Sequence, residues 1–318
     1  MLASADAIEA QKQALRLDPL WDSAEAAGMT PAGQLPLPPL RLMPQRMISF
    51  LKMHGLGNDF VVLDGRRGAP PLDADLVRRL GDRHRGIGFD QLVLIEASER
   101  ADVALRFFNA DGSEAGACGN ASRCVAALVG RELDRRQVTL ATSAGVLASR
   151  LLDDGRIAVD MPAPRFDWRD VPLAGPADTL GIDLGVAGLP PAVALSMGNP
   201  HAVLFVDDVD LVEQLGPALE RHAVFPERAN IGFARALAPD RLRLRVFERG
   251  AGLTLACGSG ACAALVAAVR RGLVAERAVL ELDGGELEVA WAGEGPVRMS
   301  GSYAISFSGS FDPATIGR

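Results

Sequence analysis

The sequence of 318 residues lacks a long hydrophobic run, and no stretch approaches the ~20 apolar residues needed to cross a bilayer. It also lacks an excess of positive charge, because the formal net charge is −7 at pH 7. Binding to nucleic-acid phosphates needs a basic face, so this charge balance argues against a nucleic-acid partner. With 48% hydrophobic and 23% charged residues, the composition is typical of a soluble globular protein.

Cysteine and histidine are scarce, and the four cysteines include no C-x-x-C pair. A structural zinc site or a thioredoxin-type redox site is therefore not expected. The first residues carry acids and lack the uninterrupted apolar core of a signal peptide. Without a signal-peptide pattern we expect a cytoplasmic protein. The cytoplasm is reducing, so its cysteines should remain thiols.

Residues 1–46 differ in composition from the rest of the chain. Five prolines lie between Thr30 and Pro44, which favours extended and poorly packed chain. We expect a disordered extension without a catalytic role, and translation starting at Met47 is one explanation for it.

Short apolar runs follow, and each is broken by Gly, Asp or Pro. Their length and composition predict β-strands; the clearest are 60–64, 91–96, 103–108, 156–161, 202–208 and 241–247. Helices are predicted near 73–83 and 209–221, and directly after two of the cysteines, Cys118 and Cys257. The last of these helices should end at Arg270-Arg271-Gly272, where cations in the final turn precede a glycine.

Two parts of the chain repeat each other. FFNADGSEAGACGNASRCVAALV (107–129) resembles VFERGAGLTLACGSGACAALVAA (246–268), and Cys118 and Cys257 are 139 positions apart. Asn58 and Asn199 lie in a second repeated segment with an offset of 141. A nearly constant offset predicts two homologous halves, joined near 163–166. The expected fold is α+β, with two pseudo-symmetric domains that each wrap a curved, mostly antiparallel sheet or barrel around a central helix.

Cys118 and Cys257 are the repeated residues best suited to chemistry. Each stands in Ala-Cys-Gly before a predicted helix, whose free N–H groups and positive dipole end should lower the thiol pKa. The same N–H groups can bind a substrate carboxylate. Two opposed thiols could remove a proton from one face of an α-carbon and return one to the other. Cys124 and Cys262 lie inside their helices and are expected to be small buried residues.

At these residues the sequence resembles the diaminopimelate epimerases, a family of pyridoxal-independent, two-cysteine amino-acid epimerases. The resemblance runs from about Met47 to about Phe307. It is carried by seven motifs in order: KMHGLGNDFVVLD, GIGFDQ, FFNADGSE, ACGN, MGNPHAV, FPERANIGF and ERGAG followed by ACGSGA.

The resemblance implies epimerisation of LL-2,6-diaminopimelate to the meso form, in lysine and peptidoglycan precursor synthesis, without a metal or cofactor. Cys257 would accept the proton in the LL-to-meso direction and Cys118 would donate one. His201 and Glu248 would support the thiols. The implied substrate-binding residues are Asn58, Gln91, Asn109, Gly119, Asn120, Asn199, Asn230, Glu248, Arg249, Gly258 and Ser259.

The resemblance also implies that the final strand returns to the first domain. The halves would then be 47–164 with 303–318, which holds Cys118, and 165–302, which holds Cys257. The only partners expected are the small-molecule substrate and a second copy in a homodimer. Departures from the family pattern at Ala121, Leu253 and Ser302 bear on rate and fine specificity.

Three alternatives stay open at this point. A proline or hydroxyproline racemase of the same fold would also use two cysteines, but its substrate has one carboxylate and a ring. Arg249 and the several asparagines favour a longer, doubly zwitterionic substrate. The lack of a C-x-x-C pair disfavours a thiol redox protein. The intact pair Cys118 and Cys257 disfavours a catalytically inactive binder.

Overall fold

The computed structural model describes residues 47–68, 70–116 and 118–318. The N-terminal extension expected over 1–46 lies outside the described residues, so the expectation of disorder there stays a prediction. Among the described residues, no helix combines the length and the apolar character needed to span a membrane.

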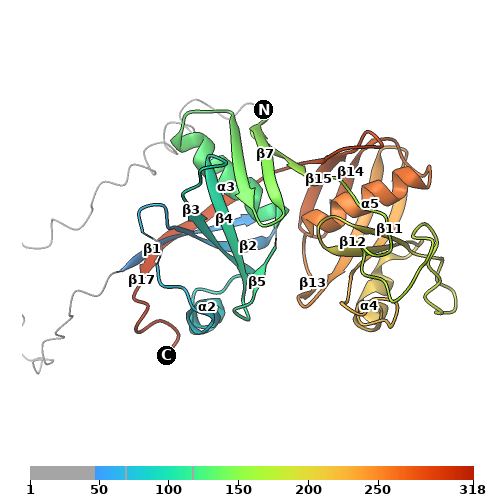
Figure 1. Ribbon diagram of the computed structural model, residues 1–318, viewed down its shortest axis with the longest axis horizontal. Helices are drawn as coiled ribbons and strands as arrows, with labels where there is room; N and C mark the ends of the chain where they lie inside the picture. Colours follow the sequence, from blue (N-terminus) through green and yellow to red (C-terminus); the bar gives the residue numbers. More distant parts are fainter. Residues whose placement is uncertain (1–46, 69, 117) are drawn as a thin grey trace, which may run out of the picture. The chain divides into compact units, whose positions relative to one another are not determined.

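The first half of the described chain is a run of short strands interrupted by two helices (Figure 1). Its elements are β1 (Ile48–Gly55), β2 (Asn58–Asp64), α2 (Ala74–Gly81), β3 (Gln91–Glu96), β4 (Val103–Asn109), β5 (Glu114–Ala115), α3 (Gly119–Glu132), β6 (Gln137–Thr142), β7 (Gly145–Leu151) and β8 (Ile157–Met161).

The second half has the same order of elements and one additional strand at its end. Its elements are β9 (Val193–Ser196), β10 (Pro200–Phe205), η1 (Val209–Leu211), α4 (Val212–Glu220), β11 (Asn230–Ala238), β12 (Arg241–Glu248), β13 (Gly252–Leu253), α5 (Gly258–Arg270), β14 (Arg277–Leu282), β15 (Gly285–Ala290), β16 (Val297–Gly301) and β17 (Ala304–Phe311).

Strand pairing repeats between the halves. β2 with β3 and β4 with β6 are parallel, and so are their counterparts β10 with β11 and β12 with β14. The other pairs are antiparallel, including β8 with β16, which joins the two sheets, and β1 with the C-terminal β17. The predicted pair of pseudo-symmetric, mostly antiparallel sheets is therefore confirmed. The domain boundaries at 164/165 and 302/303 stay a prediction.

Each sheet curves around one helix, as Figure 1 shows for α3 and α5. Helix α3 packs against β1, β6, β7 and β8, whereas α5 packs against β9, β10, β11, β14, β15 and β16. Most residues of both helices are buried: α5 is rich in Ala, Val and Leu, whereas α3 also buries the polar residues Asn120, Ser122 and Arg123. Cys124 and Cys262 are both 0% exposed within this core, as expected for small buried residues.

One predicted strand extends too far. The apolar run at 202–208 predicts a strand to residue 208, but β10 ends at Phe205. Asp208 instead begins the helical segment, because its carboxylate accepts the N–H of Asp210 at 2.9 Å. An aspartate that caps a helix in this way takes the last residues of the run out of the sheet.

Candidate active site

Each of the two repeated cysteines is the N-cap of a central helix. Cys118 has extended backbone angles, φ −144° and ψ 108°, and its Sγ accepts the N–H of Ala121 at 3.5 Å. Cys257 has φ −113° and ψ 109°, and its Sγ accepts the N–H of Gly260 at 3.3 Å. The prediction that both thiols lie at helix N-termini is confirmed, and each thiol faces backbone N–H groups that lack helical partners.

Both cysteines line one cavity of about 1660 Å³. Except for His201, all residues that the sequence proposed for substrate binding or catalytic support also line it: Asn58, Gln91, Asn109, Gly119, Asn120, Asn199, Asn230, Glu248, Arg249, Gly258 and Ser259. Leu253, one of the departures from the family pattern, lines it as well and is 39% exposed. The fold thus gathers residues from both halves around the two thiols.

The N-termini of α3 and α5 meet at this cavity. The Nδ2 of Asn120, two residues after Cys118, donates to the carbonyl of Ala256 at 2.9 Å, directly before Cys257. A methyl group added at Gly258 would lie 3.1 Å from Asn120 Oδ1, so the glycine permits this close approach. The two thiol-bearing segments are therefore in direct contact through Asn120.

Burial changes the expected protonation of the thiols. The N–H of Ala121 lowers the pKa of Cys118, but desolvation outweighs it and raises that pKa to about 12. Desolvation also raises the pKa of Cys257 well above its ordinary value, and the neighbouring Glu248 carboxylate raises it further. The sequence-based expectation of lowered thiol pKa values is therefore wrong, because removal from water disfavours the thiolate.

Glu248 is the charged group that acts on Cys257. It accepts a hydrogen bond from the hydroxyl of Thr254, and its charge raises the pKa of Cys257. Burial raises the pKa of Glu248 above its ordinary value, so this carboxyl takes up a proton more readily than an exposed one.

His201 lies behind the cavity wall rather than on it. Its side chain is 1% exposed, and its Nε2 lies 2.9 Å from Asn199 Oδ1. Burial lowers the pKa of His201 to about 3, so the ring is neutral near pH 7. Since an amide oxygen only accepts hydrogen bonds, Nε2 must carry the proton and hold the Asn199 amide in place.

The remaining proposed binding residues are held by hydrogen bonds within each half. Gln91 Nε2 donates to Asn109 Oδ1 at 3.0 Å, across the neighbouring strands β3 and β4. Asn230 Oδ1 accepts the backbone N–H of Arg249 at 3.0 Å, while its Nδ2 donates to the carbonyl of Pro200 at 2.9 Å. Amide groups and one guanidinium together can recognise both carboxylates and ammonium groups.

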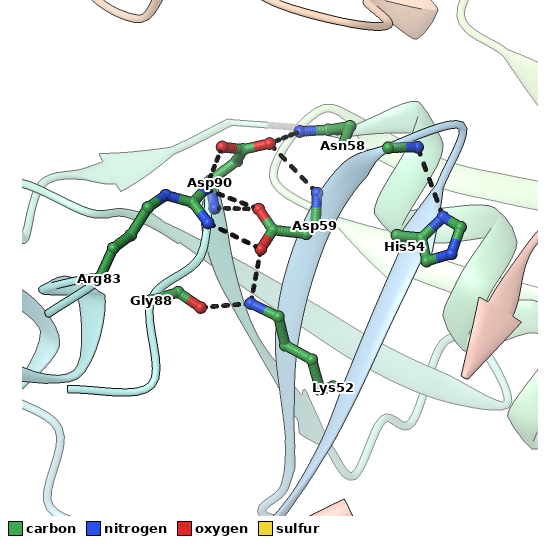
Figure 2. Close-up of polar contacts among 8 residues, drawn as sticks. Lys52, His54, Asn58, Asp59, Arg83, Gly88 and Asp90 are labelled. Atoms are coloured by element: carbon green, nitrogen blue, oxygen red, sulfur yellow. Dashed lines mark hydrogen bonds and ion pairs between the residues drawn. The ribbon is translucent and has the colours of Figure 1, made fainter. Parts of the chain in front are cut away.

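The structure adds a charged cluster that sequence reasoning missed. Lys52, Asp59, Arg83 and Asp90 line the cavity and pair with one another beside Asn58 (Figure 2). Asp90 lies in the motif GIGFDQ, next to Gln91, and that position was the available signal. Lys52, Asp59 and Arg83 are distant from Asp90 or from one another in the sequence, and only the fold brings them together.

Arg123 is a second buried charged residue whose role the sequence did not predict. It is 0% exposed within α3, and its Nη1 donates to Asn120 Oδ1 at 2.9 Å. Among the described residues, its Nε and Nη2 have no hydrogen-bond partner. The repeat offset of 139 aligns Arg123 with the buried Cys262, which could have indicated an inward-facing arginine.

Comparisons with known proteins agree with this architecture. The family model described as diaminopimelate epimerase matches residues 50–166 and 193–305. A protein of Acidiphilium cryptum named diaminopimelate epimerase is 56% identical over 84% of this chain and 97% of its own length. One of Rhodospirillum centenum with the same name is 54% identical over 82% of this chain and 91% of its own.

Two solved structures show the same fold at low identity. A hydroxyproline epimerase from Agrobacterium vitis has a TM-score of 0.60 at 18% identity, covering 85% of this chain and 94% of its own. A predicted epimerase from Pseudomonas aeruginosa has a TM-score of 0.61 at 20% identity, covering 83% of this chain and 99% of its own.

Proposed function

This chain belongs to the diaminopimelate epimerase family, and we propose that it converts LL-2,6-diaminopimelate to meso-2,6-diaminopimelate. The reaction is an isomerisation that serves lysine and peptidoglycan precursor synthesis. The observation that carries the proposal is the pair of helix-capping cysteines that line one cavity and whose segments are connected through Asn120.

Substrate binding uses the polar groups around the thiols. The reacting carboxylate lies against the N-termini of α3 and α5, where Gly119, Asn120, Gly258 and Ser259 offer N–H groups. The distal carboxylate and ammonium group lie against Arg249 and the amides, because a guanidinium binds a carboxylate bidentately. Two bound ends let the site select one of the two α-carbons.

Proton transfer then inverts the stereocentre. The Cys257 thiolate removes the α-proton and becomes a thiol, leaving the electron pair on the α-carbon and its carboxylate. The Cys118 thiol delivers its proton to the opposite face and becomes a thiolate, so the charge of the pair is conserved. The helix N-termini stabilise the negative charge that develops on the carboxylate. In the meso-to-LL direction the two cysteines exchange roles.

Thiolate formation is the difficult step in a buried site. Burial raises the pKa of Glu248, and once this carboxyl is protonated its charge no longer opposes the Cys257 thiolate. The substrate ammonium group adds a positive charge near the pair, which favours the thiolate further. His201 supports the same thiol indirectly, since Asn199 Nδ2 lies 3.4 Å from Ser259 Oγ, and Ser259 Oγ lies 3.7 Å from Cys257 Sγ.

A direct assay tests the proposal. Wild-type protein should convert LL-diaminopimelate to the meso form, measured by chiral chromatography, and should leave L-proline and trans-4-hydroxy-L-proline unchanged. Cys118→Ser and Cys257→Ser should each lose most activity, because an alcohol is a far weaker acid than a thiol near neutral pH. Racemisation of proline without turnover of diaminopimelate would instead favour the racemase alternative.

A cytoplasmic location and a homodimer also belong to this proposal. The location is expected from the composition of the first residues and the free cysteines, and the homodimer is implied by the resemblance described above. Cell fractionation tests the location, and light scattering on the purified chain tests the homodimer.

A further inference from the structure

The side-chain amide of Asn58 lies between a carboxylate and a thiol. Its Nδ2 donates to Asp90 Oδ2 at 2.8 Å (Figure 2). On the opposite side, its Oδ1 lies 4.0 Å from Cys118 Sγ, the outer limit for a hydrogen bond to sulfur, and accepts from Asn120 Nδ2 at 3.1 Å. The orientation of this amide decides whether Cys118 faces an acceptor or a donor.

A carboxylate only accepts hydrogen bonds, so Asp90 requires the Nδ2 of Asn58 on its side. Asp90 is itself held in place: Arg83 Nη2 donates to its Oδ1 at 2.7 Å, and the Asp59 backbone N–H donates to its Oδ2 at 3.1 Å (Figure 2). Arg83 and Lys52 also pair with the Asp59 carboxylate, and their hydrogen bonds and charges hold the pKa of Asp59 at about 2 despite its burial. Asp90, the anchor for the amide, is therefore part of an ionic cluster.

The other end is fixed independently. Arg123 only donates hydrogen bonds, so the bond from its Nη1 fixes Asn120 Oδ1 at 2.9 Å. Asn120 must then direct Nδ2 toward Asn58 Oδ1 and the carbonyl of Ala256. Charged groups at both ends thus specify the same orientation of the Asn58 amide.

The second half makes the contrast clear. Asn199 corresponds to Asn58 in the repeat, but its Oδ1 faces the buried, neutral His201. Its Nδ2 therefore points to Ser259, the neighbour of Cys257. The two halves thus turn opposite ends of equivalent amides toward the site: Asn58 presents its oxygen to the Cys118 thiol, whereas Asn199 presents its Nδ2 to Ser259. The group behind each amide determines its orientation.

We propose that Asp90 is a positioning residue, which holds the Asn58 amide so that its carbonyl oxygen faces the Cys118 thiol and keeps that thiol ready to donate its proton. The catalytic part of this inference rests on the function proposed above. The orientation of the thiol itself can be tested without substrate.

The test is a double-variant cycle on Asp90 and Asn58. The rate of Cys118 alkylation by iodoacetamide is followed across pH by peptide mass spectrometry in Asp90→Ala, Asn58→Ala, the double variant and wild type. The charged groups that act on Cys118, Glu248 and Arg123, are retained in all four. Asp90 also raises the pKa of Glu248, and the effect of its lost charge appears equally with and without Asn58, so the cycle separates it from the action through the amide. The matched control is Asp283→Ala, which removes an ion-paired carboxylate outside the cavity.

Loss of Asp90 should shift the pH profile of Cys118 alkylation down by about half a unit to one unit, because the thiol form loses its acceptor; at a fixed pH below the thiol pKa the rate should rise about 3- to 10-fold. In the Asn58→Ala background the shift should be clearly smaller, since the part that passes through Asn58 is already lost. An equal shift in both backgrounds, or no shift in either, would overturn the proposal. Asp283→Ala should behave as wild type.

Turnover provides the second readout. Asp90→Ala should lower kcat for LL-diaminopimelate about 10-fold, and the double variant should be no slower than Asn58→Ala alone. Additive losses would overturn the proposal. If wild type itself fails to epimerise diaminopimelate, the proposed function is wrong, whereas the alkylation cycle still decides the role of Asp90.

Discussion

His201 should make the stability of the protein depend on pH in a defined way. Its pKa is about 3 in the folded protein, against an ordinary value of 6.5, because the ring is buried. Between these two values the unfolded chain binds a proton that the folded chain does not, so stability falls as the pH drops below about 6.5. One pH unit corresponds to about 1.4 kcal/mol, so at about pH 5 the loss from this residue is about 2 kcal/mol.

The measurement is urea unfolding of wild type and His201→Gln at about pH 7 and about pH 5. Glutamine keeps a donor for Asn199 but does not titrate, so wild type should lose about 2 kcal/mol more than the variant between the two pH values. The exposed His84 offers a matched control, and His84→Gln should lose as much as wild type. Equal losses in wild type and His201→Gln would refute the account of a buried, neutral His201.

Three further changes test the packing of the site. Gly119→Ala would place a methyl 2.7 Å from Met299 Cε and should cost about 1–2 kcal/mol in urea unfolding, whereas Gly116→Ala, with its nearest atom at 3.6 Å, should cost less than 0.5 kcal/mol. Glu220→Ala should cost about 2 kcal/mol, because this buried carboxylate accepts the N–H of Gly250 at 3.0 Å; an unchanged urea midpoint would contradict this. Arg123→Met should change the free energy of unfolding by less than about 1 kcal/mol, because it removes a buried cation with few hydrogen-bond partners. It should still lower kcat about 10-fold, since Asn120 loses the guanidinium that holds it, and an unchanged kcat would exclude that role.

The repeat made much of the fold predictable. A constant offset between similar segments requires two similar supersecondary units, and the Ala-Cys-Gly segments indicated where the central helices begin. The end of α5 was also predictable, because Arg270, Arg271 and Gly272 form a familiar termination signal. The end of β10 was not, since an apolar run does not reveal that Asp208 will cap the next helix.

The electrostatics of the site depended on contacts that sequence does not encode locally. A helix N-terminus alone would lower the pKa of Cys118, but residues from both halves bury the thiol and reverse the sign. Asp90 and Arg123 gain their roles from Asn58 and Asn120, which they meet only in the folded chain. Residue type therefore indicated the chemistry, whereas the state of each group needed three-dimensional neighbours.

Proton exchange in deuterated water tests the two-cysteine reaction most directly. LL-diaminopimelate is incubated with wild type, Cys118→Ala and Cys257→Ala, and deuterium at the α-carbon and the configuration are followed by NMR and chiral chromatography. Wild type should form meso-diaminopimelate that carries deuterium at the inverted centre, and neither variant should invert the substrate. Near-normal epimerisation by either single variant would contradict the account.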